Sequence, residues 1–63
     1  MNEAEERQFK IERAGNYLAE RAELLTRACD ANLRGVVIWE AVEYYRKELH
    51  RAIDDWNMVV AHV

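Results

Sequence analysis

Apolar side chains recur at alternating intervals of four and three residues in the second half of the chain. The series consists of Ile38, Val42, Tyr45, Leu49, Ala52, Trp56, Val59 and Val63. Such an alternation keeps side chains on one face of an α-helix that packs along its length against other helices. We call this series the seam. Residues 36–38 are β-branched and would suit a short strand, but no second strand is predicted to pair with them. The pattern therefore predicts a helix over about residues 36–62.

The first half of the chain has a heptad spacing of its own and predicts a helix over about residues 3–31. The bulky line of this helix consists of Ile11, Leu18 and Leu25. A small row beside it consists of Gly15, Ala22 and Cys29, with Ala14 and Ala28 on the other side of the line. Bulky and small rows side by side let a partner helix approach closely. We expect Tyr45, Leu49 and Trp56 to fill the space that the small row leaves. Glycine in a helix interior costs up to ~1 kcal/mol, so a packing reason is expected for Gly15.

Acidic residues mark the predicted start of the first helix. Glu3, Glu5 and Glu6 complement the positive end of the helix dipole, and Asn2 is a candidate N-cap. Acid–base pairs four residues apart are expected to support the same helix. They are Glu3–Arg7, Glu6–Lys10 and Glu23–Arg27.

The connection between the two helices falls within residues 30–35. Asn32 and Gly35 tolerate left-handed backbone conformations, so either residue can end the first helix. Asp30 or Asn32 can instead cap the second helix. With no prolines and two glycines in the chain, long helices are the default expectation.

The chain length sets a limit on stability. Its 63 residues make a single helical domain over residues 1–63, which buries only about 60% of the surface that the unfolded chain exposes. Cys29 is the only cysteine, so reinforcement by an internal disulfide is excluded, and oligomerisation remains. We therefore predict an all-α, antiparallel two-helix hairpin that forms a homodimeric four-helix bundle. The residues expected at the helix and dimer interface are Ile11, Leu18, Ala22, Leu25, Ile38, Val42, Tyr45, Leu49, Trp56 and Val59.

The second predicted helix carries more apolar surface than one partner helix can cover. Val37, Tyr44 and Met58 widen the seam on one flank, and Trp39, Ile53 and Val60 widen it on the other. Large exposed apolar patches usually mark an interface. The candidate surface for a partner protein consists of Trp39, Tyr44, Met58 and Val60.

The sequence offers no constellation for catalysis, so we predict a protein that is not an enzyme and that needs no cofactor. Lys47 and Val59 stand three residues before the two histidines, so the Glu-x-x-His pattern of di-iron bundles is absent. His50 and Asp54 have one-turn spacing that a metal ion could use. However, His50 also belongs to a polar row with Glu43 and Asn57, which is more typical of a register-setting contact. Cys29 is expected to be buried and inert.

Charge and hydropathy narrow the choice of partners. The net charge is −3, and 33% of the residues are charged, with both signs mixed. This balance disfavours general affinity for nucleic acids or anionic membranes. No apolar run approaches the roughly 20 residues of a transmembrane helix. A lone cysteine and the lack of a signal peptide indicate a cytoplasmic protein.

The basic residues of the first helix nevertheless gather on one side of a helical wheel, within a sector of about 160°. This basic strip consists of Arg7, Lys10, Arg13, Arg21 and Arg27, with Tyr17 near its middle. Three glutamates share the sector, which leaves a charge of 5 − 3 = +2. Such a strip, doubled in a dimer, suits the phosphates of a structured RNA, although a solvated face of mixed charge explains it more simply.

In its length and expected architecture the chain resembles the Rop family of plasmid copy-number repressors. These helical hairpins dimerise into four-helix bundles and bind paired RNA loops through their first helices. The sequence thus leaves two hypotheses. The first is a small regulatory protein that is homodimeric and binds a partner protein, and the alternative is an RNA-binding bundle that uses the basic strip.

Overall fold

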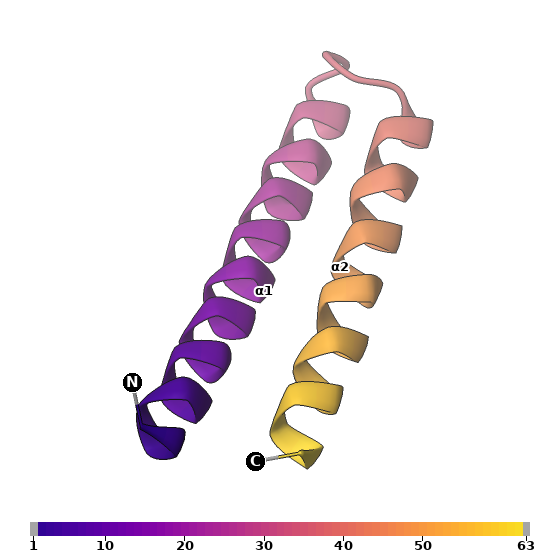
Figure 1. Ribbon diagram of the computed structural model, residues 1–63. Coiled ribbons are helices and arrows are strands. Elements are labelled where there is room, and N and C mark those ends of the chain that lie inside the picture. The colour runs from indigo at the N-terminus through magenta and orange to yellow at the C-terminus, as the bar shows by residue number, and fades with distance from the viewer. Residues whose placement is uncertain (1, 63) are drawn as a thin grey trace.

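Two long helices make up the computed structural model, which describes residues 2–62. Helix α1 spans Glu3–Leu33 and helix α2 spans Trp39–Ala61. The helices lie side by side and antiparallel, with both chain ends at one end of the hairpin and the connecting loop at the other (Figure 1). The predicted all-helical hairpin is therefore confirmed. The last position of the seam, Val63, lies outside the described residues.

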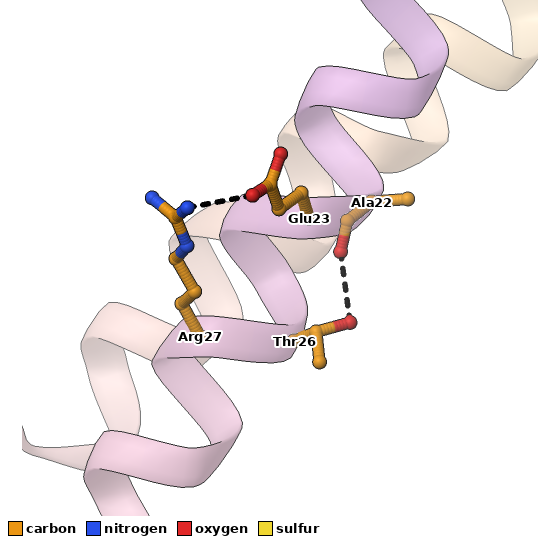
Figure 2. A network of polar contacts seen from close by, with 4 residues as sticks. All are labelled: Ala22, Glu23, Thr26 and Arg27. Atoms are coloured by element: carbon orange, nitrogen blue, oxygen red, sulfur yellow. Dashed lines mark hydrogen bonds and ion pairs between the residues drawn. The ribbon is translucent and has the colours of Figure 1, made fainter.

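The predicted N-cap of α1 is confirmed. The backbone N–H of Glu5 donates to Asn2 Oδ1 at 2.8 Å, which satisfies one of the amides that the first helical turn leaves free. Among the predicted acid–base pairs, Glu23 and Arg27 form an ion pair of 2.6 Å, shown in Figure 2.

Gly35 ends α1, as one of the two sequence alternatives predicted. Its φ of +76° lies in the left-handed region that glycine adopts without strain. The backbone N–H of Val36 donates to Ala31 O at 2.8 Å, and that of Gly35 donates to Asn32 O at 3.0 Å. These two hydrogen bonds form a Schellman motif, which satisfies carbonyls at the end of the helix.

The prediction that residues 36–38 begin the second helix is wrong. Ile38 has φ −79° and ψ 161°, and α2 begins one residue later, at Trp39. The left-handed turn at Gly35 directs the chain away from α1, and the bend at Val36 and Val37 leads through extended Ile38 into α2. Ile38 consequently leaves the seam and is 69% exposed. Asn32 caps neither helix with its side chain but donates from Nδ2 to Val37 O at 3.0 Å, which braces the loop.

The contact between the helices follows the rest of the seam. All six remaining described positions are buried or half-buried, namely Val42, Tyr45, Leu49, Ala52, Trp56 and Val59. The bulky line Ile11, Leu18 and Leu25 is half-buried on α1. In the described part of the chain, the buried residues are Ala28, Val42 and Ala52, and no large side chain is fully enclosed. The core is therefore a single layer between two helices.

The small row of α1 is only partly covered by α2. Gly15 faces Trp56, because a Cβ at Gly15 would stand 3.4 Å from Trp56 Cζ3. Ala22 and Cys29 are exposed, whereas Ala28, on the other side of the bulky line, is buried. Helix α2 thus crosses α1 toward the Ala28 side near the loop. The expectation that Cys29 is buried is corrected for the same reason.

Replacing Gly35 with alanine should destabilise the hairpin. A residue with a Cβ is strained at a φ of +76°, although no neighbouring atom stands in its way. We expect Gly35→Ala to lower the free energy of unfolding by about 1 kcal/mol or more in urea denaturation at one fixed protein concentration.

Gly15→Ala is the matched control. The added Cβ meets Trp56 at a van der Waals distance, and alanine favours the helix by up to about 1 kcal/mol over glycine. We therefore expect an unchanged or raised free energy of unfolding. Equal losses in the two variants would contradict the assignment of Gly35 as the stop signal of α1.

Candidate functional site

One side of the hairpin carries exposed apolar side chains from both helices. Gly15 lies on the flank of α1 that carries the small row, and it contacts Trp56 of α2. The exposed residues of the two helices on this side therefore form one continuous surface. At about 100° per residue, six exposed apolar residues project on this side. We call them the apolar face; they are Ala22, Cys29, Leu33, Trp39, Ile53 and Val60.

Two polar side chains beside the apolar face, Thr26 and Arg46, are engaged within the chain. The Thr26 hydroxyl donates a hydrogen bond to Ala22 O at 3.0 Å, as Figure 2 shows, so its donor is already satisfied within α1. Arg46 projects from the same flank of α2 and pairs with Glu43 at 2.7 Å. Exposed Asn57 projects from the same side of α2 as Trp39, so a partner that covers this surface also meets the polar amide of Asn57.

The accessible surface of the chain is larger than that of a typical folded monomer. The area is 5065 Å² for a mass of 7.5 kDa, roughly 800 Å² more than the ~4,200 Å² expected for a monomeric protein of that mass. A stable protein interface covers roughly 800 Å² of each partner. The excess thus has the size of one interface.

The four residues predicted as a partner surface do not form one patch. All four are exposed. Trp39 and Val60 belong to the apolar face, whereas Tyr44 and Met58 project from the opposite flank of α2. The Tyr44 ring stands edge-on to Tyr45, with ring centroids 5.3 Å apart.

On that opposite side, two adjoining hollows of about 490 and 320 Å³ form a groove between α1 and α2 toward the chain ends. We call it the terminal groove; it is lined by Arg7, Lys10, Arg13, Ala14, Tyr17, Glu20, Asp55, Met58, Val59 and His62. The structure thus brings three basic residues of the predicted strip, and Tyr17, together with Met58 of the predicted partner surface.

Arg21 lies between Ala14 and Ala28 on the α1 flank that faces α2, and its side chain is only 22% exposed. Its guanidinium carbon stands 5.0 Å from the centroid of the Tyr17 ring, and its Nη2 is 3.0 Å from Glu20 Oε1. Arg21 Nε is buried without a hydrogen-bond partner. Arg21 is therefore engaged within the hairpin, and its stack occupies one face of the Tyr17 ring.

The distribution of ion pairs singles out the terminal groove. In the described part of the chain, five arginines have a carboxylate partner, namely Arg21, Arg27, Arg34, Arg46 and Arg51. The cations outside these pairs are Arg7, Lys10, Arg13 and Lys47. The first three of these line the groove. The predicted pairs of Glu3 with Arg7 and Glu6 with Lys10 are not among the ion pairs of residues 2–62.

Metal ligands and membrane-spanning helices are two further features that would point to a function. Within residues 2–62, no three His, Cys, Asp or Glu side chains gather as metal ligands. Neither described helix combines the length and apolar character that crossing a membrane requires. Sequence reasoning missed the terminal groove, although the three-residue spacing of Arg7, Lys10 and Arg13 was a signal for one basic edge.

A comparison of the chain with protein-family models, curated proteins and solved structures finds no match. The resemblance to the Rop family accordingly rests on length and architecture. A shared architecture is weak support for a shared function. The features of the chain that bear on its function are therefore the apolar face and the terminal groove.

Arg21→Met should not weaken the hairpin. Methionine fills a similar volume along the contact and removes the buried Nε that has no partner, which offsets the lost stack on Tyr17. We expect the free energy of unfolding to stay level or rise by about 1 kcal/mol in urea denaturation.

Arg13→Met is the matched control, because exposed Arg13 has no ion-pair partner within residues 2–62. Its free energy of unfolding should change by less than about 0.5 kcal/mol. A large loss for Arg21→Met alone would show that the guanidinium stabilises the contact between the helices.

Proposed function

We propose that the protein is a small, non-enzymatic interaction protein that works as a homodimer and binds a partner protein. In this proposal two hairpins pack through their apolar faces into a four-helix bundle. The observation that carries it is the single-layer core, which encloses three small residues and leaves Leu33, Trp39 and Ile53 exposed. A hairpin of this size gains stability by covering those side chains.

A second copy is a suitable occupant of the apolar face on grounds of area and shape. The surplus of roughly 800 Å² equals what each subunit of a standard dimer covers. Small residues such as Ala22 and Cys29 lie beside large ones such as Leu33 and Ile53, so two copies of the face can interlock. Twofold dimers are the commonest protein oligomers.

The terminal groove is on the opposite side of the hairpin and stays accessible in such a dimer. It offers the proposed regulatory protein a surface for another molecule, once in each subunit. We also propose a cytoplasmic location, where a reducing environment keeps the single thiol of Cys29 reduced.

Ile53→Glu should separate the proposed dimer. The substitution puts a carboxylate in the middle of the apolar face, where a second copy would have to desolvate it. Light scattering on a sizing column should give twice the chain mass of 7.5 kDa for the unaltered protein and the single mass for Ile53→Glu. Lys47→Glu, an exposed change away from the apolar face, should remain a dimer. An unaltered chain that is monomeric at high micromolar concentration would refute the homodimer.

RNA binding is the alternative function, and a specific observation favours it. Arg7, Lys10 and Arg13 stand outside the ion pairs of the described chain, and Lys10 and Arg13 line the same hollow as Tyr17. If they bind phosphates, the affinity for a labelled RNA hairpin should fall steeply with salt, and Arg13→Glu should weaken it further. Absence of binding at low salt in a gel-shift assay would eliminate this alternative.

A further inference from the structure

The terminal groove combines an apolar floor with one basic edge. Half-buried Ala14, Tyr17 and Val59 form the floor, and exposed Met58 stands at its α2 side. Arg7, Lys10 and Arg13 follow one another along α1 at intervals of three residues. A ligand that fits this groove therefore needs an apolar surface beside a row of negative charges.

The balance of charge in the groove is positive on α1 and negative on α2. Glu20 is already paired with Arg21 at 3.0 Å. Asp55 is the acidic residue of α2 in the lining. The carboxylates of a bound ligand are thus attracted to the α1 edge and repelled from the α2 edge. This asymmetry selects a negatively charged ligand and also fixes the orientation in which it binds.

We infer that the terminal groove binds an acidic amphipathic helix of a partner protein, with apolar side chains on the floor and carboxylates against Arg7, Lys10 and Arg13. This inference rests on the proposed function of binding a partner protein and names the chemistry of that partner. The groove extends along α1 from Arg7 to Glu20, about 20 Å at 1.5 Å per residue. That length accepts three to four turns of a helix, and helices commonly bind in grooves through apolar residues spaced three and four apart.

The same surface suits nucleic acid less well. The floor is apolar, and the carboxylates of Glu20 and Asp55 lie where a phosphate backbone would pass. Arg21 stacks on the Tyr17 ring, which leaves one face fewer for a nucleotide base. The groove therefore favours carboxylates on a helix over the closely spaced phosphates of RNA.

Fluorescence anisotropy with three labelled probes tests the inference on the full chain. The first probe is a helical peptide of about 16 residues with leucines on one face and glutamates beside them. The second probe has lysine in place of every glutamate, and the third is an RNA hairpin. Binding is measured for the unaltered protein, Met58→Ser, the double variant Lys10→Glu/Arg13→Glu and Lys47→Glu. Helicity and solution mass are recorded for every sample.

The glutamate peptide should bind saturably and more tightly than the lysine peptide and the RNA. The double variant should weaken its binding at least about tenfold, and Met58→Ser about fivefold. Lys47→Glu is the matched control, because it reverses a cation that is also outside the ion pairs but not in the groove, and it should change the affinity little.

The inference is overturned if folded protein binds the two peptides equally, or binds the RNA more tightly. It is also overturned if the double variant loses no more affinity than Lys47→Glu. The solution mass separates this result from the dimer proposal. A dimer without peptide binding refutes the groove alone, whereas a monomer that binds the glutamate peptide as described refutes the dimer alone.

Discussion

Each helix of this structure has only one other helix to pack against, and the rest of the structure depends on this constraint. Each helix can turn only part of its circumference toward its neighbour, so the contact encloses Ala28, Val42 and Ala52 and leaves larger apolar side chains half covered. The interior of a larger domain would surround such side chains with further layers. Here the contact divides the surface of the hairpin into two open sides, the apolar face and the terminal groove. Both proposals, the homodimer and the helix-binding groove, start from that division.

The end of α1 determines much of what the two open sides contain. Gly35 stops α1 through its left-handed conformation, and residues 36–38 carry the chain across to Trp39. Near the loop, α2 then lies on the Ala28 side of the bulky line and leaves Cys29 uncovered. Toward the chain ends the contact reaches Gly15 and Trp56. The small residues of α1 are consequently shared between the hairpin contact and the apolar face.

The sequence predicted the hairpin well, because a long helical period is a strong signal that local details do not override. It identified the seam from Val42 to Val59, the cap at Asn2 and the alternative that Gly35 ends α1. It failed at Ile38, because the heptad spacing continues through a loop whose β-branched residues carry no strong stop signal. The sequence pattern also did not predict which side of the bulky line of α1 is covered by α2. Small residues flank that line on both sides, and Arg21 makes the side that is covered look polar.

The terminal groove was beyond sequence reasoning for a related reason. Its lining joins α1 residues of the basic strip to α2 residues of the widened seam, and only the relative rotation of the helices brings Lys10 near Asp55 and Val59. The residue pattern of one helix predicts one edge of the groove, but it does not predict which residues of the other helix lie opposite that edge.

The central claim is that the hairpin is completed by a second copy on its apolar face. The most direct test is the midpoint of thermal unfolding, followed by circular dichroism over a wide range of protein concentration. If folding is coupled to dimerisation, the midpoint rises with concentration, because mass action favours the associated, folded state. A midpoint that does not change with concentration would contradict the claim and would mean that the single layer between α1 and α2 suffices for folding.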